Sequence, residues 1–388
     1  MKPKDAFDDF SVKVPFFVPS ITKRDKTVVM NALNSSLLTD GPKLRQFEKD
    51  FSKFTGARYA IGVSNGTAAL HLALNSLNLK KNDEIIIPDL TFVATASAVL
   101  LAGAKPVLAD VDLDDMNISP TSIEKNITPQ TKAILPVHLA GKACKINKII
   151  SIAKTHNLSI LEDCAHAIGT KYNGKHVGTF GKAGCFSFYP TKNFTTIEGG
   201  MVITNSKRIA DFVRTARNHG LTKSLSQRFS RGKPWDYDVK QTGFNYRLDE
   251  IRASLGINQL KRVKKLNELR KSVCKYYYEN LSDIDGIIAP NISNKSDNVY
   301  HLYIIRVNKN YGKSRDNLFR KLLKLGIRTS LHYKPLHEFT IYKKLAKKKS
   351  LSNTINLYNE ILSLPLHPYL TRKEQDYVIK CIKQKVFI

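Results

Sequence analysis

Short apolar runs alternate with stretches of helical spacing between about residues 55 and 220. The runs are four to six residues long and continuous rather than alternating, which is typical of strands buried on both faces of a parallel sheet. Segments between them repeat apolar residues at helical intervals and predict covering helices. The expected strands are 59–63, 83–87, 106–111, 133–138 and 159–163, and the expected helices are 67–77, 92–101 and 148–155.

The pattern changes after residue 180. Two further strands, 184–189 and 201–204, follow each other without room for a helical crossover, and a helix over 207–218 ends this block. Residues 221–242 are polar, show no clear period and contain the only Trp, so they predict a long functional loop.

A long helical pattern over 248–281 predicts a strut between two parts of the chain. Beyond it we expect a strand over 300–307, a helix over 315–325, a strand over 327–332 and a last helix near the terminus. The fold expectation is therefore an α/β protein, with a large domain over 1–250 that holds a mainly parallel sheet covered by helices. The long helix and a smaller α+β domain fill 251–388.

Composition narrows the class of protein. No apolar run approaches the roughly 20 residues of a bilayer span, and no signal peptide is evident in the first residues. The five cysteines are widely spaced and form no CxxC pair, which argues against a disulfide framework and a zinc site. We expect a cytoplasmic protein without a membrane partner.

The net charge of +29 allows a nucleic-acid partner. However, the basic excess lies mostly in helix-like segments after residue 250, where 28 basic residues face 10 acidic ones, and no nucleic-acid-binding motif accompanies it. A solvated lysine-rich surface without a nucleic-acid partner is the favoured interpretation. A field that attracts an anionic small substrate is the alternative.

Several familiar motifs are absent. Gly312-Lys313-Ser314 lacks the glycine five residues earlier that a P-loop needs, and no GxGxxG or GxSxG occurs. The stretch from Asp163 to His166 has no second cluster at ligand spacing, so we expect no metal.

Two charged residues at strand ends carry the candidate chemistry. Asp163 ends an apolar strand, and Lys192 follows another strand 29 residues later, before Glu198-Gly199-Gly200. Ligands of open α/β sheets bind at these carboxyl ends. An aspartate that pairs with a protonated ring nitrogen, and a lysine that forms a Schiff base, suit pyridoxal 5′-phosphate (PLP). Burial would lower the pKa of the lysine and favour its nucleophilic amine.

A phosphate also needs a binding site. Gly66 and Thr67 lie at a strand-to-helix turn whose free backbone N–H groups could hold a dianion, although a simple Asn or Thr cap explains the same residues. Phe92 begins another such turn and could stack on a flat ring, but an isolated phenylalanine is more often part of the core.

In this order, these motifs resemble the DegT/DnrJ/StrS family of PLP-dependent sugar aminotransferases. The resemblance covers nearly the whole chain, and its most specific part is FSFYPTKN with EGGM, which comes after EDCAHA. It implies the aspartate-aminotransferase fold, PLP fold type I, and PLP as the cofactor.

The resemblance also implies roles for individual residues. Lys192 matches the Schiff-base lysine and Asp163 the ring-nitrogen partner, while His166 stands where the family has a Gln or His near the phenolic oxygen. The phosphate and ring contacts match Gly66, Thr67, Ser187 and Phe92. Asn245 matches a residue that family members contribute from the neighbouring subunit, which implies a homodimer with shared active sites.

The implied reaction moves an amino group from glutamate to a keto sugar on a nucleotide diphosphate, in the synthesis of surface polysaccharides or glycoconjugates. One branch of the family dehydrates sugars and has histidine at the position of the Schiff-base lysine. Lys192 therefore argues against that branch. A non-catalytic regulator that binds PLP is the alternative. The sequence does not identify the sugar or the nucleotide. It also does not identify the substrate contacts made by residues 221–242 or by the region around His332.

Overall fold

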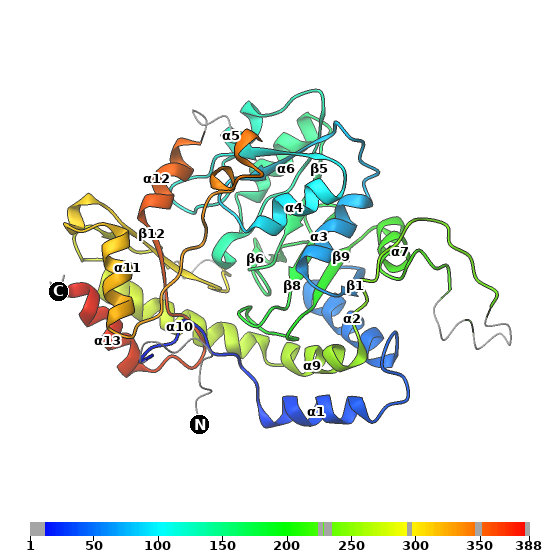
Figure 1. Ribbon diagram of the computed structural model, residues 1–388, viewed down its shortest axis with the longest axis horizontal. Coiled ribbons are helices and arrows are strands. Elements are labelled where there is room, and N and C mark those ends of the chain that lie inside the picture. The colour runs from blue at the N-terminus through cyan, green and yellow to red at the C-terminus, as the bar shows by residue number, and fades with distance from the viewer. Residues whose placement is uncertain (1–11, 224–227, 229–234, 293–296, 346–350, 385–388) are drawn as a thin grey trace.

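The computed structural model describes residues 12–223, 228, 235–292, 297–345 and 351–384. A seven-stranded sheet forms its centre, with helices on both faces and a smaller sheet to one side (Figure 1). The strand order is β1-β9-β8-β5-β4-β2-β3. The strands are β1 (Tyr59–Val63), β2 (Glu84–Pro88), β3 (Lys105–Ala109), β4 (Thr131–Ile134), β5 (Ser159–Asp163), β8 (Ala183–Ser187) and β9 (Gly200–Thr204).

All strands of this sheet run parallel except β9, which pairs antiparallel with β1 and β8. The carboxyl ends of β1, β2, β4, β5 and β8 therefore lie at the same edge. The expectation of a mainly parallel sheet covered by helices is confirmed, as is the direct succession of β8 and β9 without a helix.

Side chains on successive strand residues enter different cores. Ile85 and Ile87 pack with one group of helices, whereas Ile86 between them faces another. This alternation follows from the two-residue period of a strand and explains the continuous apolar runs of the sequence. One face carries α3 (Gly66–Asn75), α4 (Val93–Leu101) and α7 (Lys207–Ala216). The other carries α2 (Pro42–Thr55), α5 (Pro120–Lys125), α6 (Ile146–Thr155) and α9 (Glu250–Leu260).

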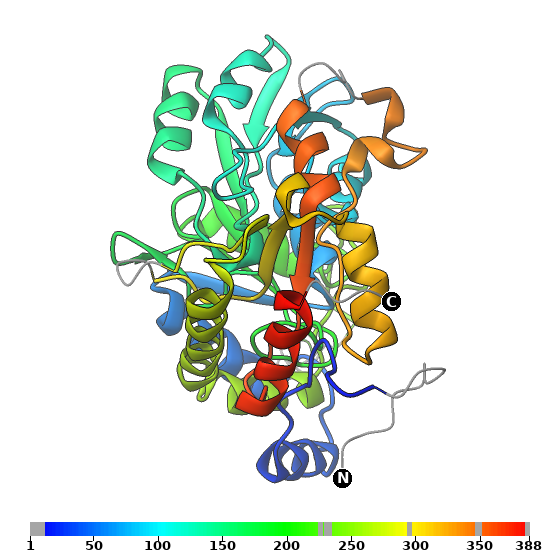
Figure 2. The ribbon, with the colours of Figure 1, turned by 90° about the vertical axis from the view of Figure 1, so that its left-hand side faces the viewer.

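The smaller sheet has the order β10-β11-β12 and is antiparallel. Figures 1 and 2 place it beside the large sheet, with α10 (Val263–Leu281), α11 (Arg315–Lys324) and α13 (Arg372–Lys383) around it. Its strands are β10 (Ile287–Ile288), β11 (Tyr303–Val307) and β12 (Ile361–Leu364), and α12 (Ser352–Glu360) leads into β12. A two-stranded hairpin, β6 (Lys171–Tyr172) and β7 (Lys175–His176), completes the strands. Helix α1 (Lys23–Leu33) packs on α9.

Two sequence expectations need correction. The single helix expected over 248–281 is two helices, α9 and α10, with a break at Lys261 and Arg262. Residues 327–332 form no strand but only two isolated bridges, Val14 with Ile327 and Ser330 with Ser363. Their backbone hydrogen bonds are divided between Val14, in the N-terminal segment, and Ser363, in β12, so no continuous ladder of hydrogen bonds forms.

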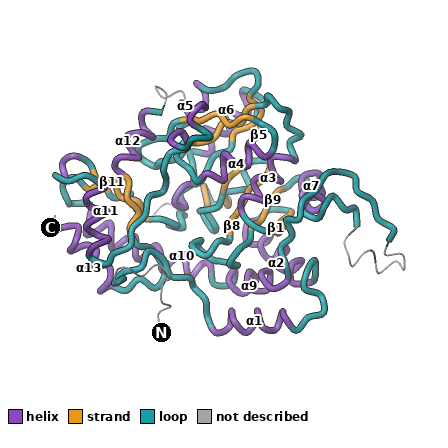
Figure 3. Tube along the Cα trace, in the orientation of Figure 1, coloured by secondary structure: helices purple, strands orange, loops and turns teal. Residues whose placement is uncertain are grey.

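The loop expected over 221–242 is long, and Figure 3 shows the described parts of it leaving the body of the molecule between α7 and α9. Residues 224–227 and 229–234 of this segment lie outside the described residues. None of the described helices combines the length and apolar character that a bilayer crossing demands. All five cysteines are free and buried.

Candidate active site

The candidate residues gather at the carboxyl edge of the large sheet. Gly66 and Thr67 begin α3 directly after β1, and Phe92 precedes α4 after β2. Asp163 is the last residue of β5, Ser187 is the last of β8, and Lys192 lies in the turn that follows. Because these strands are parallel, residues far apart in sequence come to one edge.

Asp163 is a buried carboxylate with two fixed hydrogen bonds. Its Oδ2 accepts from the Thr95 hydroxyl at 3.0 Å, and its Oδ1 accepts from the backbone N–H of Ala165 at 3.1 Å. Burial raises the pKa of Asp163, while these two donors and the positive charge of Lys192 act in the opposite direction. A cationic group placed against this carboxylate would therefore keep it ionised.

Lys192 lies close enough to Asp163 for their charges to interact. Burial of the ammonium group lowers the pKa of Lys192 to about 8, although the negative charge of Asp163 opposes this shift. The turn is tied down by its backbone, since the N–H of Lys192 donates to the carbonyl of Tyr189 at 2.9 Å. The uncharged amine, which is the nucleophilic form, is thus far more populated near neutral pH than in an ordinary lysine, although the ammonium form still predominates at pH 7.

The turn from β1 to α3 approaches the end of β8. A Cβ on Gly66 would lie 2.8 Å from the Cβ of Ser187, so only glycine allows this approach. Asn65 caps α3 by accepting from the N–H of Ala68 at 2.8 Å. The cap expected from the sequence is present, but it leaves the N–H groups of Gly66 and Thr67 without an acceptor among the described residues. Ser187 adds a hydroxyl beside this helix N-terminus, a combination suited to an anion.

Phe92 and Tyr333 form an aromatic wall beside the site. The side chain of Phe92 is 53% exposed, and its ring centroid lies 5.7 Å from that of Tyr333. Phe92 is therefore not a core residue, which leaves its face open for stacking.

His166 links this wall to the sheet. Its Nδ1 accepts from the backbone N–H of Ala140 at 3.4 Å, and its Nε2 lies 2.9 Å from the Tyr333 hydroxyl. Burial, with the charge of Lys192, holds the pKa of His166 well below its usual value. The neutral ring must then carry its proton on Nε2 and donate it to Tyr333. The hydroxyl proton of Tyr333 remains available for another acceptor.

Sequence reasoning missed several neighbours of these residues. Thr95 bonds Asp163, and the ring centroid of His301 lies 4.4 Å from that of His166. Thr91 and Thr95 are one helical turn apart in PDLTFVATA and share a hydrogen bond of 3.0 Å, a spacing that could have indicated a polar stripe. His301 had no such signal, because it comes from a distant segment.

Asn245 is the one candidate that this chain does not bring to the others. Phe244 and Tyr246 stack with centroids 5.0 Å apart and pack against His71. Asn245 lies between them in the chain and is exposed. Its backbone pairs with Asn218, and no hydrogen bond joins its side chain to the candidate site within the described part of this chain. A side chain in this position is available to a neighbouring molecule.

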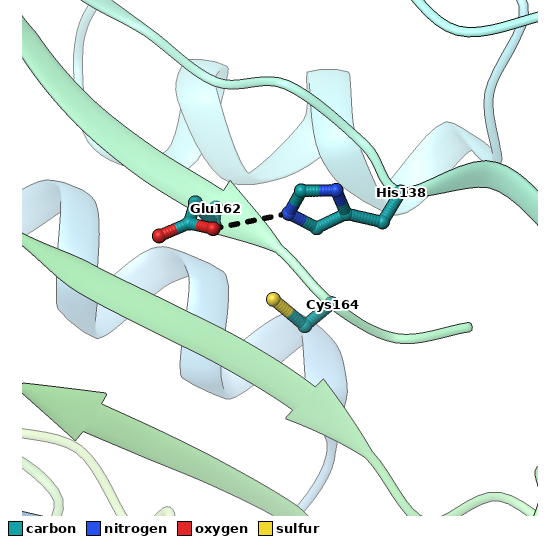
Figure 4. A group of neighbouring side chains, drawn as sticks. All are labelled: His138, Glu162 and Cys164. Carbon is teal, nitrogen blue, oxygen red and sulfur yellow. Dashed lines mark hydrogen bonds and ion pairs between the residues drawn. The ribbon is translucent and has the colours of Figure 1, made fainter. Parts of the chain in front are cut away.

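One buried cluster has the composition of a metal site: His138, Glu162 and Cys164 (Figure 4). His138 Nδ1 accepts from the N–H of Cys144 at 3.1 Å, so its Nε2 carries the proton and donates to Glu162, also at 3.1 Å. Burial raises the pKa of the Cys164 thiol well above its usual value.

Glu162 also accepts three backbone N–H groups at 2.7 to 2.8 Å, from Gly178, Phe180 and Gly181. Its oxygens are saturated by these donors, and the thiol stays protonated. The cluster therefore holds a turn in place and offers no ligand atoms for a metal.

Residues 19–383 match the family model described as the DegT/DnrJ/EryC1/StrS aminotransferase family. A relative is the spore coat polysaccharide biosynthesis protein SpsC of Bacillus subtilis, 37% identical over 377 residues, which are 96% of this chain and 97% of that protein.

Solved structures give the same result. Helicobacter pylori PseC, an aminotransferase involved in the biosynthesis of pseudoaminic acid, superposes with a TM-score of 0.89 at 31% identity, over 96% of this chain and 98% of that one. Spr1654 from Streptococcus pneumoniae, assigned as a sugar aminotransferase and solved in its PMP form, has the same TM-score, identity and coverage.

Proposed function

Because the chain belongs to the DegT/DnrJ/EryC1/StrS aminotransferase family and is a PLP-dependent sugar aminotransferase, we propose that it transfers an amino group from glutamate to a nucleotide-linked keto sugar. The product would be an amino sugar for a surface polysaccharide or glycoconjugate. SpsC is named for spore coat polysaccharide biosynthesis, and PseC is described as an aminotransferase of pseudoaminic acid biosynthesis, which supports this proposal.

The residues at the carboxyl edge suit PLP. Asp163 offers a buried carboxylate for the ring nitrogen, and Phe92 offers an exposed ring face. Gly66, Thr67 and Ser187 present the N–H and hydroxyl donors that a phosphate needs. His166, which bonds the Tyr333 hydroxyl of the same wall, would lie near the phenolic oxygen of the cofactor.

When bound, PLP supplies an electron sink for the substrate carbon that exchanges a proton. Lys192 provides the amine to which we propose the cofactor is attached, and its pKa of about 8 lets it accept and return a proton near neutral pH. Asp163 would hold a proton on the ring nitrogen, and Thr95 and Ala165 would keep the carboxylate in position.

The observation that carries this assignment is the pairing of Lys192 with the buried carboxylate of Asp163, whose charges interact. Apo-protein should be incubated with PLP, reduced with borohydride and digested, and the label located by mass spectrometry. We expect the label on Lys192, and Lys192→Ala as the control should remain unlabelled. A label on another lysine would disprove the proposed attachment.

The donor and acceptor are tested separately. Purified enzyme should be assayed with glutamate and a panel of nucleotide-linked keto sugars, and 2-oxoglutarate and amino sugar should form in equal amounts. Replacing the nucleotide-linked sugar by the free sugar is the control. Activity with free sugars alone would contradict the proposed acceptor class.

We also propose that the enzyme works as a homodimer with shared sites. Asn245 is exposed and separate from the site of its own chain, and the segment that precedes it carries the exposed apolar side chains of Trp235 and Val239. In a two-fold dimer the same segment of each subunit can reach the other subunit's site.

A further inference from the structure

Arg270, on α10, is a buried cation, and no carboxylate of the described residues pairs with it. Its side chain is 3% exposed, and its Nη1 donates to the backbone carbonyls of Leu366 at 3.1 Å and His301 at 3.4 Å. Burial lowers the pKa of Arg270 to about 10, so the guanidinium still carries its charge at neutral pH. Its Nε–H finds no acceptor in the described part of the chain. A buried donor left in this state is costly unless something else accepts from it.

Two buried amide oxygens, those of Gln259 and Asn193, likewise lack a hydrogen-bond partner among the described residues. Gln259 donates from Nε2 to the Ser20 carbonyl at 2.7 Å, and Asn193 donates from Nδ2 to the Val299 carbonyl at 2.9 Å. A carbonyl can only accept, so these bonds fix both amide orientations. The oxygens, Oε1 of Gln259 and Oδ1 of Asn193, are then buried without a donor among the described residues.

The three side chains line one small cavity. Its volume of about 10 Å³ is room for the centre of a single water molecule. Lys192 and Thr195 also line it, so it lies directly beneath the turn that carries the candidate lysine.

The unpaired groups are one N–H donor and two carbonyl oxygens. A water molecule can accept from the donor and donate to both oxygens. A halide would satisfy Arg270 but leave both oxygens without a donor, and a cation would be repelled by the guanidinium.

We propose that this cavity is the site of one internal water, which accepts from Arg270 Nε–H and donates to Gln259 Oε1 and Asn193 Oδ1. The water joins α9 and α10 to Asn193, the residue after Lys192, and so acts as a positioning group for that lysine. The positioning role rests on the proposed function of Lys192, whereas the water site itself does not.

The site is tested on the unmodified enzyme. Crystals grown with bromide and measured at the bromine absorption edge should show a peak without anomalous signal, about 2.7 to 3.2 Å from each of the three atoms. An anomalous peak would assign a halide instead. An empty cavity, in a map where other internal waters are visible, would also overturn the proposal.

The positioning role is tested by Gln259→Met, with Gln375→Met as the matched control. Gln375 is also buried, on α13, and donates to the Val273 carbonyl at 3.0 Å, but neither Gln375 nor Val273 lines this cavity. Both variants lose one buried amide-to-carbonyl bond, but only Gln259→Met also removes an acceptor of the water.

We expect both variants to have similar melting temperatures. Gln259→Met alone should weaken PLP binding roughly fivefold to tenfold, the equivalent of one hydrogen bond, and should shift the pH midpoint of the visible absorption of the bound cofactor. Equal behaviour of the two variants would disprove the positioning role. Borohydride labelling away from Lys192 would instead disprove the proposed function and leave the water site standing.

Discussion

At the scale of single residues, Lys192 and Asp163 have pKa values shifted toward each other. Burial lowers the pKa of the lysine and raises that of the aspartate, because both charged forms lose hydration. Each charge also opposes the shift of the other. Such pairs are frequent at functional sites, because a group that titrates near the working pH can take up and release protons.

The lowered pKa of Lys192 predicts how PLP addition depends on pH. Only the uncharged amine attacks an aldehyde, so the rate of addition to apo-protein should rise with pH and level off above about 8. An ordinary lysine would keep gaining rate toward its usual pKa near 10.4. Stopped-flow absorbance between pH 6 and 10 measures this profile, and free N-acetyl-lysine is the control. A rate that still climbs steeply above pH 9 would contradict the burial of this amine.

Asp163→Asn keeps the shape of the side chain and removes its charge. We expect the cofactor to be largely retained, because the phosphate and ring contacts are unchanged. Transamination should fall about a thousandfold or more, equivalent to ~4 kcal/mol of transition-state stabilisation, because the ring nitrogen is no longer kept protonated. Turnover with glutamate and the cofactor content of the protein are measured together. Asp83→Asn, at the opposite edge of the sheet, is the control, and near-normal turnover of Asp163→Asn would show that another group holds the ring.

At the scale of elements, the sequence predicted the central sheet well. The side chains of Ile85-Ile86-Ile87 are buried on both faces of the sheet. A strand buried on both faces needs an unbroken run of apolar residues, and such a run can be recognised in the local sequence. Asp163 and Lys192 were found for the same reason, since each comes at a recognisable strand end.

The elements that were predicted wrongly depend on distant partners. The helix break before α10 coincides with Arg262, whose guanidinium donates to the Ser20 carbonyl at 2.9 Å and to Asp25 at 2.8 Å. Residues 327–332 share their backbone bonds with Val14 and Ser363. Tyr333 and His301 reach His166 only through the tertiary fold. None of these contacts has a local signal in the sequence.

The end of β5 also supports the turn over 178–181 through Glu162. Glu162→Gln keeps an acceptor but places an NH₂ group against backbone N–H donors or against His138. We expect a loss of about 3 kcal/mol in the free energy of unfolding, the scale of broken bonds to a buried charge. Chemical denaturation measures it, with Glu124→Gln on the exposed side of α5 as the control.

The same cluster makes a prediction about metals. Because the hydrogen bonds of His138 and Glu162 use their ligand atoms, treatment with EDTA should leave the melting temperature and the activity unchanged. Activity that is lost with the chelator and restored by one divalent metal would contradict this interpretation.

At the scale of the whole molecule, the core crosses the expected domain boundary at residue 250. Leu336, Tyr342 and Leu351 pack in the same cluster as the strands of the large sheet. Asp89, after β2, binds the buried His337 at 2.6 Å. The division into 1–250 and 251–388 remains a prediction, and these contacts indicate that the two parts stabilise each other.

The shared-site proposal is tested by mixing subunits. We expect Lys192→Ala to be inactive because the cofactor has no amine to attach to. We expect Asn245→Ala to be inactive because it removes a group that the neighbour's site needs. In a hybrid dimer one site carries both defects and the other carries neither, since each subunit lends its own Asn245 to its partner. Random exchange makes about half of the dimers hybrid, so about a quarter of all sites should be intact.

Activity can therefore recover in the mixture only if Asn245 acts in the site of the partner subunit. A second mixture, of two variants whose defects lie in the same chain's site, is the control. Lys192→Ala mixed with Asp163→Asn gives hybrids in which each site keeps one defect, because both residues belong to the same chain's site. This control should recover no activity above that of Asp163→Asn alone. Tagged subunits separated in tandem confirm that hybrids have formed in both mixtures. If confirmed hybrids of Lys192→Ala and Asn245→Ala stay inactive, Asn245 serves its own chain, and its exposed position between Phe244 and Tyr246 needs another explanation.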